Sequence, residues 1–180
     1  MSTGRIRRAL LLGMLMILAS SAAMAVNDVV AVVTGQTQGA IEGSYVFQGS
    51  DVVQVLEYHH LMLSGDGRPP SGNVDSQEVI FTKRADRATV NLWEAYDTDE
   101  ALTVRFEHWL DCGTLLRVHQ VELNGAKIWA IEPAWSDGES SVTERIRLRF
   151  QQMTVTNTEL DSGCSTGSSD HVTIMGSLAE

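Results

Sequence analysis

The sequence predicts a mainly β domain, an antiparallel sandwich or barrel, with one short α-helix. Two observations predict this class. Short runs of alternating apolar and polar residues recur along the chain, separated by turn residues. Only one stretch, EVIFTKRADRATVNLWEAYD (78–97), changes from strand spacing to helix spacing. The rest of the chain after residue 25 has the length of one ordinary domain, 26–180, and is long enough to bury a core.

Residues 1–25 have the three parts of a secretory signal peptide. MSTGRIRR is basic, ALLLGMLMILA is apolar, and Ala23, Met24 and Ala25 form a cleavage site of the A-x-A kind. We expect cleavage after Ala25 and a periplasmic or extracellular protein. The alternative is an uncleaved membrane anchor. Later stretches are too short and too polar to cross a bilayer, so we expect no membrane contact after processing.

The charge of the chain excludes one class of partner. The formal net charge is −10, and processing would remove three arginines and leave −13. Such a surface repels phosphate groups, so we expect neither nucleic acid nor anionic lipid as a partner.

The strands are expected from regular spacing between turn signals. In order they are 29–35, 51–63, 78–83, 102–110, 115–123, 127–135, 142–155 and, less distinctly, 171–175. The segment SGDGRPPSGN (64–73) is a loop, because glycine, proline and serine dominate it. Residues 160–170 are rich in serine and glycine, which leaves a hairpin loop and a tail as alternatives.

The strand after residue 142 alternates most regularly. Glu144, Ile146, Leu148 and Phe150 share one face, which we expect to be mostly core. The other face carries a basic ladder, and the alternation slips at Gln151, as at a β-bulge. The ladder consists of Arg145, Arg147 and Arg149. Either it is a solvated face paired across strands with carboxylates, or it contacts an acidic patch of another subunit, which makes it the candidate subunit interface.

The helix is expected just after the charged residues 83–87. Asp86 is a suitable N-cap, and an apolar stripe follows at i, i+3, i+4 and i+7 spacing. The stripe consists of Thr89, Leu92, Trp93 and Tyr96. A helix this short needs support from the sheets, so we expect this stripe to be buried.

The two cysteines, Cys112 and Cys164, both lie in turn-like sequence. In an exported chain such a pair suggests one disulfide. The alternative is two free thiols that never meet. A metal site is disfavoured because neither cysteine has another cysteine or a histidine at ligand spacing.

Catalytic patterns are absent from the sequence, including nucleophile elbows, metalloprotease helices, phosphate-binding loops and paired-cysteine zinc sites. His59 and His60 are adjacent on a strand and therefore face opposite ways. We expect His108 to be a satisfied core histidine. The tryptophans 109, 129 and 135 suit a core better than a sugar-stacking platform. We therefore expect a protein that is not an enzyme and that uses no cofactor or metal.

Two motifs resemble the haemolysin-coregulated protein (Hcp) family, the tube protein of bacterial type VI secretion. The first is FTKRADRATVNL (81–92), in which Phe81, Thr82, Lys83, Asp86, Thr89, Asn91 and Leu92 fit, while Val90 replaces the usual proline. The second is GESSVTERIRLRF (138–150), in which Gly138, Glu144, Ile146, Leu148 and Phe150 fit. The order of elements also agrees over about residues 29–155.

The resemblance implies a two-sheet β-barrel with one helix at its side, assembled as a hexameric ring. Family rings stack into a tube inside a contractile sheath, beneath a trimeric spike protein, and carry small effectors. The signal peptide departs from the family pattern, because the tube usually leaves through its own machine. The rival hypothesis is an exported binding module on the same barrel, for protein or carbohydrate, that works outside the contractile apparatus.

Overall fold

The computed structural model describes residues 27–63, 76–135 and 141–176. The predicted signal peptide, with its cleavage position after Ala25, and the predicted loop 64–73 lie outside these residues. The elements are β1 (Asn27–Gly35), β2 (Gly39–Ile41), β3 (Tyr45–Phe47), β4 (Ser50–Gln54), β5 (Glu57–Leu63), β6 (Ser76–Arg84), α1 (Ala88–Asp97), β7 (Leu102–Asp111), β8 (Leu115–Ala134), β9 (Thr143–Arg149), β10 (Gln152–Leu160) and β11 (Thr166–Met175).

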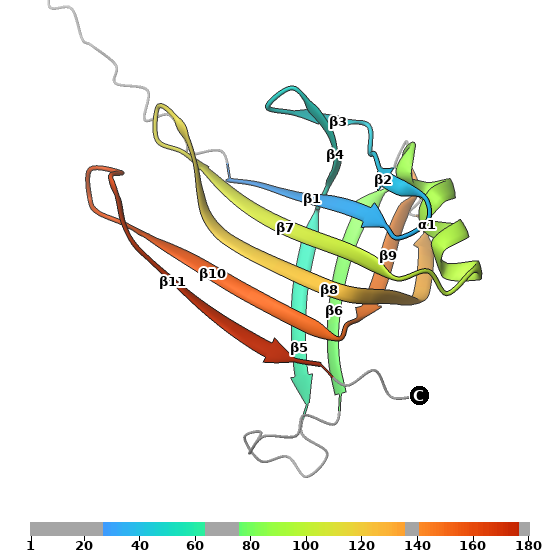
Figure 1. Cartoon of the computed structure of the whole chain (residues 1–180). Helices are drawn as coiled ribbons and strands as arrows, with labels where there is room; N and C mark the ends of the chain where they lie inside the picture. Colours follow the sequence, from blue (N-terminus) through green and yellow to red (C-terminus); the bar gives the residue numbers. More distant parts are fainter. Residues whose placement is uncertain (1–26, 64–75, 136–140, 177–180) are drawn as a thin grey trace, which may run out of the picture.

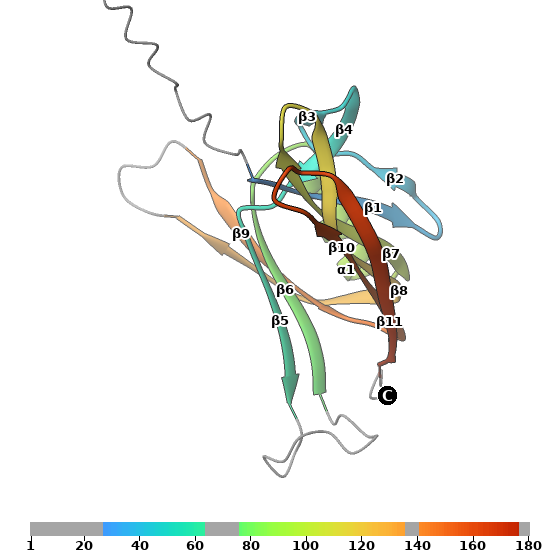
Figure 2. The ribbon, with the colours of Figure 1, turned by 90° about the vertical axis from the view of Figure 1, so that its left-hand side faces the viewer.

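The strands form two antiparallel layers that cross steeply (Figures 1 and 2). One layer contains β1, β7, the first half of β8, β10 and β11, and we call it the central sheet. The other contains β5, β6, β9 and the second half of β8, and we call it the cross sheet. Helix α1 lies where β1 ends (Figure 1). The mainly β fold with one short helix is therefore confirmed.

One long strand, β8, belongs to both layers. The sequence predicted two strands, 115–123 and 127–135, but β8 runs through both. Its first half pairs with β7 and β10, and its second half pairs with β9. The chain turns between the halves at Gly125, whose φ of +59° favours glycine. The sequence pattern did not reveal that β8 is continuous, because a glycine between two apolar runs predicts a turn.

The run 51–63 was predicted as one strand, and the structure divides it. β4 pairs with β1 in the central sheet, whereas β5 pairs with β6 in the cross sheet. At the corner the amide of Val55 donates to the carbonyl of Val29, and the amide of Leu56 donates to that of Thr82. These two bonds connect the layers at the corner. The sheet of the described strands is otherwise open, with β3 at one edge and β5 at the other.

The predicted bulge at Gln151 is also wrong in detail, because the chain changes sheets there. β9 pairs with β6 and β8 in the cross sheet, and β10 pairs with β8 and β11 in the central sheet. The amide of Gln151 donates to the Asn124 carbonyl, and its carbonyl accepts from the amide of Gly176. Residues 160–170 contain the turn of the β10–β11 hairpin and the start of β11.

The core lies between the two layers and beneath the helix. The expected core face of β9 is buried, including Glu144, Ile146, Leu148 and Phe150. The prediction for the helix was partly wrong, since α1 buries Ala88, Leu92 and Ala95, while Trp93 is 40% exposed and Tyr96 42% exposed. The small alanines let the helix lie close to β8 and β2, and the aromatic rings lie at its flank. Among the described residues, no helix is long and apolar enough to cross a membrane.

Candidate functional site

The two sequence motifs meet at one buried charge network, formed by Lys83, Asp86, Thr89, Trp93 and Glu144. Lys83 lies on β6 and Glu144 on β9, at paired positions of the cross sheet. The ammonium Nζ of Lys83 lies 2.8 Å from Glu144 Oε2 and 2.7 Å from Asp86 Oδ1. The Lys83 and Glu144 side chains are only 1% and 4% exposed.

The network satisfies nearly every polar group it buries. Lys83 Nζ also donates to the carbonyl of Arg84 at 2.7 Å. Thr89 donates to Glu144 at 2.8 Å, and the indole Nε1 of Trp93 donates to the other carboxylate oxygen at 3.3 Å. A buried ion pair is stable only when its remaining hydrogen-bonding positions are also filled. The start of α1 fills them, and this explains why a helix follows the charged segment.

Asp86 connects the same network to the helix N-terminus. Its carboxylate accepts from the amide of Ala88 at 3.1 Å, and its own amide donates to Thr89 Oγ1 at 3.0 Å. The other carboxylate oxygen accepts from the amide of Ser44 at 3.0 Å. The N-cap position of α1 is Arg87, one residue after the Asp86 that the sequence predicted, and Arg87 makes no side-chain capping bond. The Asp86 carboxylate still satisfies an amide of the first turn.

The arginine ladder, the predicted subunit interface, divides into three different environments on the outer face of the cross sheet. Arg147 lies between two carboxylates, with Nε 2.9 Å from Glu132 and Nη1 3.4 Å from Glu78. The guanidinium of Arg149 stacks 4.7 Å from the centre of the Trp129 ring. Cross-strand pairing thus accounts for these two arginines within one subunit.

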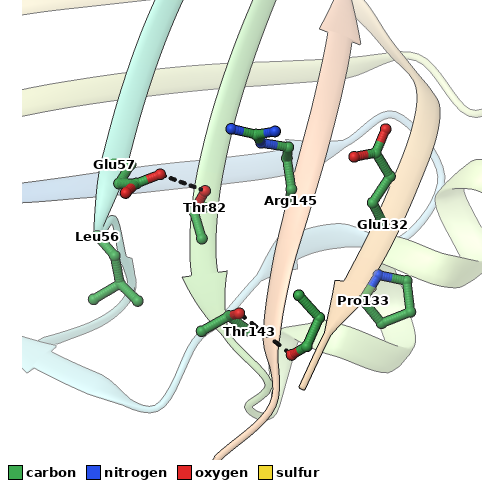
Figure 3. A pocket seen from close by; sticks show the side chains of 8 residues that line it. Leu56, Glu57, Thr82, Glu132, Pro133, Thr143 and Arg145 are labelled. Atoms are coloured by element: carbon green, nitrogen blue, oxygen red, sulfur yellow. Dashed lines mark hydrogen bonds between the residues drawn. The ribbon is translucent and has the colours of Figure 1, made fainter. Parts of the chain in front are cut away.

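Arg145 differs from the other two members of the ladder. It is exposed, and no carboxylate of the described residues lies within ion-pair distance of it. It borders a groove of about 550 Å³, with Glu57 on one side and Glu132 on the other (Figure 3). Leu56 and Pro133 add apolar surface to this groove. Arg145 is therefore the ladder residue that is available to a partner.

The sequence predicted that the three tryptophans lie in the core. In the structure they do not all lie there. Trp109 is partly buried against Phe47, with ring centres 5.5 Å apart, and donates to Glu107 at 3.1 Å. Trp129 is 38% exposed and Trp135 80% exposed, both near the end of β8. Alternation along β8 changes face at the irregularity between Ile128 and Ala130, which a sequence pattern does not reveal. The outer face of the cross sheet is therefore both aromatic and basic.

Cys112 and Cys164 join the tips of two neighbouring hairpins. Their Cα atoms lie 6.0 Å apart, and the structure links them by a disulfide across 52 residues of sequence. Cys112 lies between β7 and β8, and Cys164 between β10 and β11. β10 pairs with β8 only from Gln152 to Asn157, so this bond holds the outer part of the β10–β11 hairpin.

The histidines lie on four strands, β5, β7, β8 and β11. No group of three or more His, Cys, Asp or Glu side chains within residues 27–63, 76–135 and 141–176 is placed to hold a metal ion. His108 was expected to be a satisfied core histidine, but its buried Nε2 has no hydrogen-bond partner among these residues. Burial lowers the pKa of His108, and the neighbouring His119 lowers it further.

Two buried carboxylates escaped the sequence analysis. Glu107 binds Arg105 at 2.7 Å and Arg117 at 3.2 Å. Glu100 accepts from the amide of Gln38 at 2.9 Å and also from that of Thr37, and these bonds lower the pKa of Glu100. Both carboxylates hold neighbouring segments together. The sequence does not reveal them, because their partners are brought close only by the fold.

Comparison with known proteins agrees with this arrangement. A family model described as "Type VI secretion system effector, Hcp" matches residues 30–156. A comparison with curated proteins found no match. The matched segment contains the strands of both buried motifs, from β6 to β9.

Solved structures show the same fold. The Hcp1 protein from E. coli EAEC 042 is 21% identical, covering 79% of this chain and 96% of that chain, with a TM-score of 0.61. Hcp1 from Salmonella typhimurium is 17% identical, covering 84% and 95%, with a TM-score of 0.64. A type VI secretion system effector from Yersinia pestis is 19% identical, covering 82% and 99%, with a TM-score of 0.63. Because the family model matches more than half of the chain, the chain belongs to the Hcp family of type VI secretion proteins.

Proposed function

We propose that this protein is a non-catalytic structural component of type VI secretion, which forms hexameric rings that stack into a tube and carry small effectors. The observation that carries the proposal is the convergence of both family motifs at the Lys83–Glu144 network, within a segment that matches the family model. That network fixes α1 against the cross sheet. The contractile sheath and the trimeric spike protein are the further partners that this role requires.

The surface suits association through strands and an exposed cation. The described sheet leaves edges at β3, β5 and β11, and unpaired strand edges readily pair with another chain. A head-to-tail contact between identical subunits must either close into a ring or propagate as a filament. Arg145 stands exposed in a strongly acidic chain, so a carboxylate of the next protomer is its natural partner.

The test is assembly of the chain 26–180 as a function of salt, measured by size-exclusion chromatography with light scattering. We expect large assemblies at low salt and partial dissociation above ~0.1 M, where exposed charge pairs are screened within ~10 Å. Arg145→Gln should shift the population toward monomer without lowering the melting temperature. Arg117→Gln, which removes an exposed arginine of the central sheet that is paired within the subunit, is the matched control. Equal effects of the two variants would contradict the role of Arg145.

A second candidate is an exported binding module on the same fold, which works outside the contractile apparatus. The linked cysteines favour it, since disulfides persist mainly in oxidising compartments. Sequencing the N-terminus of protein recovered from periplasm and medium distinguishes the routes. Export predicts Val26 as the first residue, whereas Met1 on cytoplasmic protein supports the ordinary tube route.

A further inference from the structure

Several ring side chains meet where β5 lies against the central sheet, and we call them the ring cluster. The cluster consists of Tyr58 on β5, Phe106 and His108 on β7, and His119 on β8, with His60 of β5 at its edge against Phe150. The Tyr58 ring centre lies 4.8 Å from that of Phe106 and 5.9 Å from that of His108. Tyr58 therefore forms the contact between the two layers at this point.

Three polar atoms of the ring cluster are buried without a hydrogen bond. They are Tyr58 Oη, His60 Nε2 and His108 Nε2, none of which has a partner within the described segments. Unpaired buried polar groups are uncommon, and each one costs free energy. Two of these atoms, Tyr58 Oη and His108 Nε2, belong to rings that contact each other.

His108 and His119 form a direct cross-strand pair. They are opposite one another in the β7–β8 ladder, and their rings meet edge to face at 5.3 Å. On the other side of His108 the neighbour is Val29 of β1, and on the other side of His119 it is Asn157 of β10. The titratable groups that face His108 are therefore Tyr58 from β5 and His119 from β8. The first carboxylate along this row is Asp170 of β11, one strand beyond Asn157.

Within the described segments the buried Nε2 of His108 has no hydrogen-bond partner, and its neighbours along this row, Val29 and Asn157, supply no negative charge. Burial lowers the pKa of His108 and also that of His60, because the charged imidazolium loses water. The same burial raises the pKa of Tyr58, so the phenol stays neutral and supplies no negative charge. The closed contact therefore favours the neutral form of His108.

We propose that the His108–His119 pair makes the contact between β5 and the central sheet acid-sensitive, so that it closes when His108 is neutral and opens when His108 is protonated. In the open form His108 returns to its ordinary pKa, ~6.5, and therefore binds protons more readily than in the closed form. The closed form is fully stable above this pH and loses stability as the pH falls below it. The change reaches up to about tenfold in the opening equilibrium for each pH unit.

The test is amide hydrogen exchange of β5, with rates corrected for the intrinsic effect of pH. Between pH 7.5 and pH 5.5 we expect the protection of the amides around Tyr58 to fall by about tenfold, while that of α1 is unchanged. His108→Phe keeps the ring packing and should abolish the response. His171→Phe, at an exposed position of β11, is the matched control and should retain it.

A second measurement keeps the inference falsifiable if His108→Phe does not fold. Imidazole titration by NMR of the unaltered chain should place the pKa of His108 below the ordinary value, ~6.5, and His119→Gln should raise the pKa of His108. An ordinary pKa for His108, constant protection of β5, or the same acid response in the His108→Phe variant would each overturn the proposal. These readouts do not depend on ring assembly, so they stand apart from the proposed function.

Discussion

At the scale of single residues, the stability of the helix side depends on one buried ion pair. Lys83 and Glu144 are almost inaccessible, and Asp86, Thr89 and Trp93 complete their hydrogen bonds. Removing one partner leaves the other charged and buried, which is far more costly than replacing both.

Lys83→Met should therefore lower the free energy of unfolding by about 3–5 kcal/mol. The double variant Lys83→Met with Glu144→Leu should recover part of this loss, because only Asp86 then stays charged without a cation, and it keeps its bonds to the amides of Ser44 and Ala88. Urea denaturation of the single and double variants measures the difference. If the two single losses simply add in the double variant, the ion pair is not the cause.

The order of burial within the helix leads to a second comparison. Leu92 is 2% exposed, whereas its neighbour Trp93 is 40% exposed. Leu92→Ala should cost about 2–5 kcal/mol through the cavity it leaves. Trp93→Ala removes mainly a long hydrogen bond and partly exposed surface, so we expect ~1 kcal/mol. Thermal unfolding of the two variants tests this order, and a larger loss for Trp93 would restore the stripe predicted from spacing.

At the scale of elements, the sequence predicted most strands and the helix from local pattern. Alternation in 142–150 identified the buried face of β9 correctly, because that strand stays within one sheet, between β6 and β8. The pattern failed where a strand passes from one layer to the other, at Gly125, at Val55 and at Gln151. Local spacing records which side chain is apolar, but it does not record which sheet a backbone amide joins.

The candidate site could be predicted only in part from the sequence. The motif residues around Lys83 and Glu144 were identified by resemblance, yet their contact over 61 residues is a property of the fold. The arginine ladder appeared uniform in sequence. Only the structure separates Arg145 from Arg147, which has carboxylates on both sides, and from Arg149, which stacks on Trp129.

The disulfide holds the outer part of the β10–β11 hairpin, beyond the residues of β10 that pair with β8. Replacing both cysteines by serine should lower the free energy of unfolding by about 4 kcal/mol, the loop-closure value for a bond across roughly 50 residues. Protein isolated without reductant should show no free thiol. Equal stability of the oxidised protein and the double serine variant, or two labelled thiols in exported protein, would contradict a structural role.

At the scale of the whole molecule, charge and open strand edges act in opposite directions. The formal charge of −10 keeps copies of the chain apart, while the edges at β3, β5 and β11 favour pairing between them. Exposed cations such as Arg145 reduce this repulsion at a specific place. A closed assembly reconciles the two effects, because it satisfies the edges without unlimited growth.

The central claim is that copies of this chain close into a ring, and native mass spectrometry of chain 26–180 at low ionic strength tests it most directly. We expect one dominant species with the mass of six chains, seen as closed six-fold particles by electron microscopy. A monomer that persists at high concentration and low salt would contradict the tube role and favour the exported binding module.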